Sequence, residues 1–154
     1  MIVRRAIGGR VEQFNHDKEL CRKVSVDYTL AAANAMRESL ASKTSRGKFR
    51  FVFCSGKFTE WDQDKTLLFL SDSRKIKGQV EKGLCDIADA HPEEFETFIL
   101  RPSGFIGPDT PITKKVFAPL YDAISTEQVG KAMMEVGLEG AKERIIENDV
   151  LKKL

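Results

Sequence analysis

The sequence predicts an α/β fold: a parallel sheet of two or three strands with flanking helices. Two apolar segments, Phe49–Gly56 and Phe95–Leu100, have the length and composition of strands buried in a sheet. Between them an apolar stripe from Ile76 to Ala88 recurs at helical spacing. Because a strand, helix, strand order normally places both strands in one parallel sheet, we expect Phe49–Cys54 and Phe95–Leu100 to be parallel neighbours.

The first third of the chain predicts a short strand and a long helix. Met1–Ile7 is apolar enough for a third strand, and Gly8-Gly9 ends it. Asn15 or Asp17 can then cap a helix whose apolar residues recur near the helical period from Leu20 to Leu40.

The elements on either side of the second strand are bounded by caps and prolines. A cap at Ser71–Ser73 predicts the start of the central helix, and His91-Pro92 ends it. The glycines and prolines of Pro102–Pro111 predict a loop. A helix is expected to resume near Thr113, with Pro119 limiting its length.

The last third of the chain begins with a clear helix signal. Ser125–Gln128 has the spacing of a capping box and predicts a helix that ends near Gly137. Ile145–Ile146 predicts a short extended piece, and Val150-Leu151 a closing helical turn. No linker interrupts the pattern, so residues 1–154 are expected to form a single domain.

Composition excludes several classes of partner. With 154 residues, 42% of them hydrophobic and 31% charged, the chain is typical of one globular domain with its own core. A net charge of +2 gives no field that favours nucleic acid or an anionic membrane surface. The locally basic residues lack interleaved aromatic residues and predict a solvated loop; they are Lys43, Arg46, Lys48 and Arg50.

Cysteine and histidine usage points to a reduced compartment and to no metal site. Cys21, Cys54 and Cys85 are odd in number and widely spaced, which is typical of free thiols in a cytoplasmic protein. No apolar run is long enough for a membrane span or a secretory segment. His16 and His91 are far apart and lack partners at ligand spacing.

Four segments occur in an order and at spacings that resemble a known family. They are Val24–Ala33, Phe51–Gly56, the pair Lys77 and Glu81, and Arg101-Pro102. Together they resemble the atypical and extended short-chain dehydrogenases, in particular the NAD-dependent epimerase/dehydratase group. The resemblance covers nearly the whole chain and implies a partial Rossmann-like fold that corresponds to the C-terminal half of the family domain.

The chain departs from this family where the cofactor would bind. The family's catalytic tyrosine lies four residues before its lysine, and Ser73 occupies that position here. The glycine-rich turn that holds a dinucleotide pyrophosphate is missing, since Gly8-Gly9 and the pair Gly104 and Gly107 predict loop glycines. We therefore expect a truncated scaffold that uses no cofactor.

The resemblance assigns three candidate catalytic residues. Ser55 corresponds to the family's serine, Lys77 to its lysine, and Arg101 begins the loop after the next strand. Ligands of open α/β sheets gather at the carboxyl ends of the strands, so we expect a pocket between Ser55–Trp61 and Pro102–Pro111. The alternative is structural: a turn serine, a solvated lysine one helical turn from Glu81, and a surface arginine.

Aromatic residues near these loops predict an apolar ligand. Phe58, Trp61, Phe105 and Phe117 are candidate substrate-binding residues, together with Ser73 at the position of the family's tyrosine. An apolar pocket with a few polar anchors is the usual form of a small-molecule site. The expected ligand is thus an apolar, carbonyl-bearing small molecule.

These observations favour a cofactor-independent isomerase or cyclase, a redox-neutral use of a dehydrogenase scaffold for which secondary metabolism offers precedents. One alternative is a non-catalytic pseudoenzyme that binds a ligand or partner. Another is an NAD(P)-dependent oxidoreductase fragment whose nucleotide site comes from a separate polypeptide. Because a sheet lacking the family's first strands has an open edge, a homodimer is also expected.

Overall fold

The computed structural model confirms an α/β fold with a parallel sheet, and it describes residues 2–5, 9–45, 47–111 and 122–154. Within these residues the main sheet has the order β1-β2-β3-β6, and every neighbouring pair is parallel. The strands are β1 (Ile2–Arg5), β2 (Phe49–Cys54), β3 (Phe95–Arg101) and β6 (Ile145–Glu147). The short extended piece expected at Ile145–Ile146 is thus a fourth strand.

The two central strands pair as the sequence predicted. Phe49 lies opposite Phe95, and the register continues to Cys54 opposite Leu100. The connection between them is α3 (Ser71–Ala90), which packs on the sheet. Its first turn differs from the expectation, because Leu70 occupies the cap position with φ 48° and no side chain of Ser71–Ser73 caps the helix.

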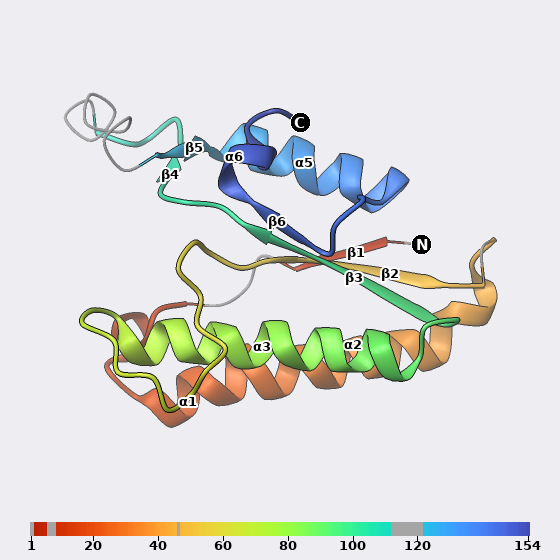
Figure 1. Ribbon diagram of the computed structural model, residues 1–154, viewed down its shortest axis with the longest axis horizontal. Helices are drawn as coiled ribbons and strands as arrows, with labels where there is room; N and C mark the ends of the chain where they lie inside the picture. The colour runs from red at the N-terminus through yellow and green to blue at the C-terminus, as the bar shows by residue number, and fades with distance from the viewer. Residues whose placement is uncertain (1, 6–8, 46, 112–121) are drawn as a thin grey trace.

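One face of the sheet is covered by α3 and by a long N-terminal helical segment (Figure 1). That segment consists of η1 (Val11–Phe14), α1 (Lys18–Arg22), a π-helical turn η2 (Lys23–Asp27), α2 (Tyr28–Leu40) and η3 (Ala41–Lys43). Asp17 caps α1, as its side chain accepts a hydrogen bond from the Leu20 amide at 2.8 Å. Of the two caps expected from the sequence, Asp17 is therefore the one used.

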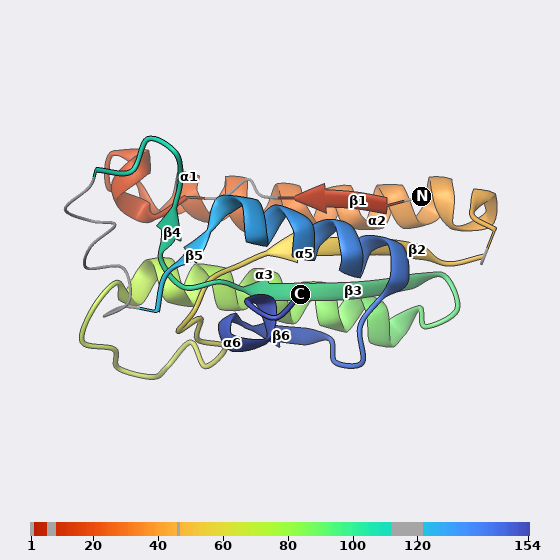
Figure 2. The ribbon, with the colours of Figure 1, turned by 90° about the horizontal axis from the view of Figure 1, so that it is seen from above.

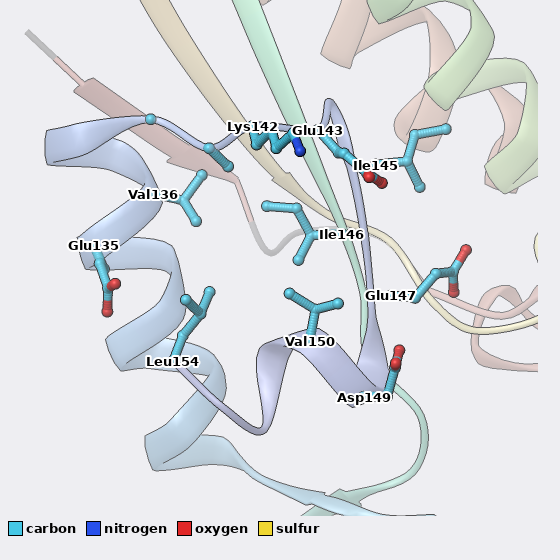
Figure 3. Close-up of a pocket in the computed structure, with 12 residues that line it drawn as sticks. Glu135, Val136, Lys142, Glu143, Ile145, Ile146, Glu147, Asp149, Val150 and Leu154 are labelled. Atoms are coloured by element: carbon cyan, nitrogen blue, oxygen red, sulfur yellow. The ribbon is translucent and has the colours of Figure 1, made fainter.

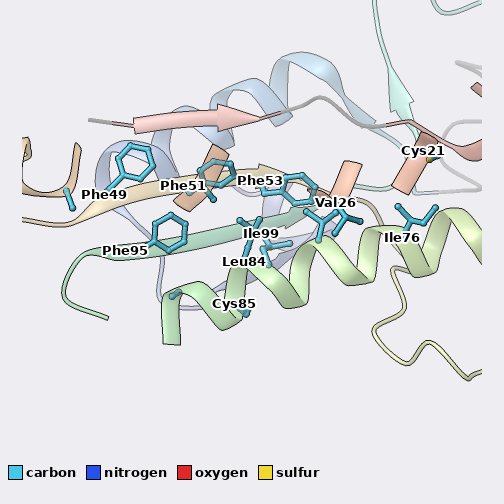
Figure 4. Packing of buried hydrophobic residues seen from close by; sticks show 14 of the residues in the cluster. Cys21, Val26, Phe49, Phe51, Phe53, Ile76, Leu84, Cys85, Phe95 and Ile99 are labelled. Atoms are coloured by element: carbon cyan, nitrogen blue, oxygen red, sulfur yellow. The ribbon is translucent and has the colours of Figure 1, made fainter. Parts of the chain in front are cut away.

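Phenylalanines of β2 and β3 fill the core beneath these helices. Phe49, Phe51 and Phe53 alternate along β2, so their side chains share one face and meet Phe95 and Ile99 of β3 (Figure 4). Complete burial of one such side chain contributes about 1.5–3 kcal/mol relative to exposure. The alternation read from the sequence therefore defines the face on which α3 lies.

The opposite face is covered by α5 (Thr126–Glu139), which crosses above β1 and β2 (Figure 2). Val52, Phe98 and Leu100 of the sheet pack there with Val129, Ala132, Met133 and Val136 of α5 in a second core. The predicted capping box is present, with Ser125 Oγ accepting from the Gln128 amide at 3.0 Å. The helix continues past Gly137 and ends before Gly140, whose φ of 87° favours glycine.

Arg50 was expected in a solvated basic loop, but it lies in β2 and is buried. Its side chain is buried under α5 and donates to Glu96 Oε1 at 2.8 Å and to the Gly137 carbonyl at 2.9 Å. A guanidinium at the carboxyl end of a helix satisfies carbonyls that lack partners within the helix. This arginine therefore anchors α5 to the sheet.

The chain leaves β3 for a small second sheet. In the described residues this sheet consists of β4 (Phe105–Ile106) and β5 (Ile124–Ser125), which are parallel, and α6 (Asn148–Leu151) follows β6. The helix expected near Thr113, its limit at Pro119, and Phe117 lie outside the described residues. None of the described helices is both long and apolar enough to span a bilayer.

Candidate functional site

A cavity of about 350 Å³ lies at the carboxyl ends of β2 and β3, where the sequence predicted a pocket. Two of its walls are the expected loops after β2 and after β3. The lining residues are Arg10, Ser55, Gly56, Lys57, Phe58, Leu70, Lys77, Pro102, Ser103, Gly104 and Phe105. The structure therefore brings Ser55 and Lys77 together, with Phe58 and Phe105 beside them.

Backbone hydrogen bonds hold the two loops in register. The Ser55 amide donates to the Leu100 carbonyl at 2.8 Å, and the Lys57 amide donates to the Pro102 carbonyl at 2.8 Å. These contacts continue the β2–β3 ladder past the end of the strands. The two walls of the cavity are therefore joined by backbone hydrogen bonds and extend from neighbouring paired strands.

Ser55 is buried, and its hydroxyl proton already has a partner. Thr59 Oγ1 donates to the Gly56 carbonyl at 2.7 Å, which uses the only proton of that hydroxyl. In the 3.2 Å contact between Ser55 Oγ and Thr59 Oγ1, Ser55 is therefore the donor. Its oxygen keeps the capacity to accept a hydrogen bond, and donation to a ligand requires this pair to rearrange.

Lys77 enters the cavity from the second turn of α3. Its Nζ lies against Gly56, where an added Cβ would be only 3.0 Å from the nitrogen. The neighbouring Gly78 lets the loop after β2 touch the backbone of α3, since a Cβ at Gly78 would lie 1.7 Å from the Glu60 carbonyl oxygen. Two glycines thus make room for the amine and fix the loop that faces it.

The Lys77 amine has an unusual environment for a lysine. Burial is the largest effect and lowers the pKa of Lys77. Cys54 opposes this shift, Arg10 lowers the pKa further, and Glu81 and Cys21 oppose the shift by smaller amounts. Among the described residues, no acceptor lies within hydrogen-bond distance of Nζ. The amine is half-buried, borders the cavity and has no ion-pair partner there.

The rim of the cavity is apolar and held in strained backbone conformations. Phe58, Leu70 and Phe105 are exposed at 58%, 41% and 52%, although they are large hydrophobic residues. Phe58 and Leu70 have φ values of 65° and 48°, in the left-handed region that such residues seldom adopt. Strain of this kind is concentrated at ligand-binding sites.

An aromatic cluster holds this rim in place. Phe58 and Phe69 meet edge to face, with ring centroids 6.3 Å apart. The Arg74 guanidinium lies 4.8 Å from the Phe69 centroid, and its Nε donates to the Phe58 carbonyl at 2.6 Å. The exposed rings are therefore ordered by contacts with α3.

Arg101 and Trp61 lie outside the cavity lining and share one buried carboxylate. Glu81 is fully buried on α3. Arg101 Nε donates to its Oε1 at 3.1 Å, Trp61 Nε1 donates to its Oε2 at 2.7 Å, and Arg101 also pairs with Glu147 at 3.0 Å. Both residues therefore have a structural role, because they bind Glu81, which lies one helical turn after Lys77 on α3.

Ser73 is also engaged away from the cavity. Its hydroxyl is buried and accepts a hydrogen bond from the Val11 amide at 3.0 Å, which ties η1 to α3. Arg10, directly before Val11, borders the cavity, so this contact positions a cation there. Neither Arg10 nor Lys57 was among the residues predicted for the site. No local pattern points to Arg10, whereas the position of Lys57, two residues after Ser55, is a signal that could have found it.

The charged groups that line the cavity are all cationic. Arg10, Lys57 and Lys77 border it, and no carboxylate does so among the described lining residues. The charge of Lys57 is balanced by an ion pair, because its Nζ donates to Asp122 Oδ2 at 3.0 Å. Lys77 and Arg10 therefore favour a ligand with an electron-rich oxygen, such as a carbonyl or carboxylate.

Cys54, at the end of β2, does not offer a ready thiolate. Burial raises the pKa of this thiol, and the nearby Lys77 charge only partly offsets the effect. In residues 2–5, 9–45, 47–111 and 122–154, no three His, Cys, Asp or Glu side chains form a group that could hold a metal ion. Lys77 and Ser55 are thus the side chains of this cavity that could take part in a reaction.

A second cavity of about 530 Å³ lies between α5, β6 and α6 (Figure 3). Val136, Ile146, Val150 and Leu154 form its apolar walls, and the carboxylates of Glu135, Glu143, Glu147 and Asp149 surround them. It is larger than the first cavity but brings no nucleophile or buried amine to one point. We therefore place the candidate site at Ser55 and Lys77.

No protein-family model matches the chain, and no curated protein matches it significantly in sequence.

Proposed function

We propose that the protein is a cofactor-independent isomerase or cyclase that acts on an apolar, carbonyl-bearing small molecule. The observation that carries the proposal is the Lys77 amine, half-buried at a cavity of suitable size and without an acceptor among the described residues. A ligand carbonyl oxygen would accept a hydrogen bond from this amine in its ammonium form. The apolar body of the ligand would lie against Phe58, Leu70 and Phe105.

The chemistry of such a site needs no hydride. An ammonium beside a carbonyl oxygen stabilises the negative charge that develops there when an α proton moves or a ring closes. Because the pKa of Lys77 is lowered, the same amine can give up and regain a proton more readily than a surface lysine. Ser55 would accept a hydrogen bond from the ligand, since its own proton is directed at Thr59.

The sequence resemblance also suggests from which family the scaffold derives. We infer that the chain is built on a scaffold that corresponds to the C-terminal half of a short-chain dehydrogenase domain. In support, the lysine and serine of the resemblance border one cavity at the carboxyl ends of neighbouring parallel strands. Arg101 does not share that position, so the proposed reaction rests on Lys77 and Ser55.

A non-catalytic ligand-binding remnant is the second candidate. It is favoured by the lining itself, because the described lining residues include cations but no carboxylate or imidazole to act as a paired base. A panel of unsaturated ketones and keto acids separates the two functions. An isomerase or cyclase converts a member of the panel to a product of equal mass, detected by chromatography with mass spectrometry, whereas a remnant binds it unchanged.

We also infer a cytoplasmic location and a homodimer. The three cysteines are all free, which suits a reducing compartment. In the described part of the chain β1 pairs with β2 alone and leaves an outer edge of the sheet without a neighbouring strand. Two copies joined by a twofold axis would cover such an edge with its own equivalent.

A further inference from the structure

The Lys77 side chain differs from Lys57, the other lysine that lines the cavity. Lys57 is held by Asp122, which also accepts from Lys152 at 2.6 Å and from Asn148 at 2.8 Å. Lys77 has no such carboxylate contact, and its Nζ lies beside Gly56 at the cavity wall. A lysine that is desolvated and unpaired is the type that acts as an amine nucleophile.

The groups around Lys77 come from several elements and do not supply a strong counter-charge. Arg10 precedes η1 and is cationic, whereas Cys54 on β2 and Cys21 on α1 are thiols whose pKa values burial raises. Glu81 lies on α3 itself, and its carboxylate is occupied by Arg101 and Trp61. Nothing described next to Nζ therefore holds it in the ammonium form by direct contact.

From this geometry we propose that Lys77 forms a covalent imine with carbonyl compounds that enter the cavity. The inference rests on the proposed function in one respect, namely that the ligand carries a carbonyl group. The amine lone pair attacks the carbonyl carbon, and a carbon–nitrogen double bond replaces the carbon–oxygen double bond. The nitrogen gives up two protons, the carbonyl oxygen leaves with both as water, and no oxidant or reductant is consumed.

An imine would extend what the site can do. Once protonated, the carbon–nitrogen double bond withdraws electrons more strongly than the parent carbonyl, so an α proton is lost more readily and the carbon accepts an internal nucleophile. Both outcomes are redox-neutral. The apolar rim of Phe58, Leu70 and Phe105 suits an aromatic or aliphatic aldehyde or ketone.

Reductive trapping tests the proposal directly. Full-length protein is treated briefly with limiting benzaldehyde and sodium cyanoborohydride near neutral pH, and the benzylated lysines are identified by peptide mapping. We expect Lys77 to be labelled at least about tenfold faster than Lys82, which lies on the same helix, is exposed and pairs with Asp86. Labelling of Lys77 at the rate of Lys82 would overturn the proposal.

Two variants sharpen the result. Lys77→Arg keeps the positive charge but removes the nucleophile, so fast labelling should vanish, whereas Lys82→Arg, at an exposed position away from the cavity, should retain it. The comparison of Lys77 with Lys82 within the wild-type protein needs no variant and remains decisive where a variant does not fold. Fast labelling that persists in Lys77→Arg would assign the reactive amine to another residue and refute the proposal.

The same experiments separate this proposal from the proposed function. Selective trapping at Lys77 without conversion of any ligand supports the imine and counts against the isomerase or cyclase. Conversion that Lys77→Arg retains, together with unselective trapping, supports a cationic role for Lys77 and overturns the imine.

Discussion

At the scale of single residues, two lysines on α3 have contrasting environments. Lys77 is half-buried at the cavity, whereas Lys82 is exposed and forms an ion pair with Asp86 one helical turn away. Pairs of the second kind contribute only about 0.3–0.5 kcal/mol. The two positions therefore provide a test of function and its matched control on the same helix.

We predict that Lys77→Met lowers turnover of a converted ligand by about thirty- to a thousandfold, or about 2–4 kcal/mol of transition-state stabilisation. Lys82→Met should leave turnover unchanged. Ser55→Ala should cost less than Lys77→Met, because a neutral hydroxyl makes weaker hydrogen bonds than a cation. Steady-state rates of the three variants check the order, and a Lys77→Met enzyme with full activity would contradict it.

The lowered pKa of Lys77 predicts a dependence of stability on pH. At pH values between the folded and unfolded pKa, the unfolded chain binds more protons at this lysine, so the free energy of unfolding rises with pH. The rise in the free energy of unfolding occurs at pH values below 10.5, the ordinary lysine pKa, and it is absent in Lys77→Met. Urea unfolding of both proteins across that range should show wild type gaining on the variant, whereas parallel profiles would contradict the assignment.

At the scale of elements, the site depends on close contact between α3 and the loop after β2. Gly78 permits this contact, because any side chain there would overlap the Glu60 carbonyl. Glu81 and Trp61 fasten the same loop one turn further along α3. The loop that carries Ser55 is thus positioned by a backbone approach and by a hydrogen bond.

Replacing Gly78 with alanine should therefore destabilise the protein, by about 1–3 kcal/mol, as the helix and loop separate. The matched control is Gly130→Ala on α5, where an added Cβ meets nothing within 4 Å. That substitution should stabilise the protein by about 0.4–1 kcal/mol, because alanine restricts the unfolded chain. Chemical denaturation of both variants checks the opposite signs, and a neutral Gly78→Ala would show that the contact is not tight.

The sequence predicted the central elements well because their signals are local. The alternating phenylalanines of β2, the stripe on α3 and the capping box of α5 each occupy one continuous segment. β6 was predicted only as a short extended piece, because three residues carry little periodicity and their pairing with β3 joins distant parts of the chain. Leu70 gave no signal as a cap, since its left-handed conformation depends on the packed rim.

The candidate site was predictable in part for the same reason. Ser55 and Lys77 were assigned by the family resemblance, whose matching segments are the end of a strand and the first half of the next helix. The position of Arg101 depends on Glu81, and no local pattern reveals that this carboxylate is buried. Arg10 reaches the cavity because Ser73 binds the neighbouring amide, a contact between residues 62 positions apart in sequence.

At the scale of the whole molecule, we predict that the protein does not bind nicotinamide cofactors. The glycine-rich turn is missing from the sequence, and the position of the family's tyrosine is held by Ser73, whose hydroxyl accepts from Val11. Calorimetric titration with NAD(H) and NADP(H) should give no heat of binding. Micromolar affinity for NADPH would instead favour an oxidoreductase fragment.

The outer edge of the main sheet leads to a prediction about assembly. Because β1 pairs on one side only among the described residues, we expect a dimer at micromolar concentration. Size-exclusion chromatography with light scattering should give twice the monomer mass. A monomer that persists throughout this concentration range would show that the edge is protected within one chain.

The hydrogen bond between Trp61 and Glu81 gives the molecule a built-in optical reporter. Trp61 is the single tryptophan of the chain and is carried by the loop that forms one wall of the cavity. Its indole is partly exposed, at 38%, so its emission wavelength is sensitive to any shift of that loop relative to α3. The tryptophan fluorescence of this protein consequently originates beside its candidate site, and a ligand that moves the wall shifts the wavelength of this emission without any attached dye.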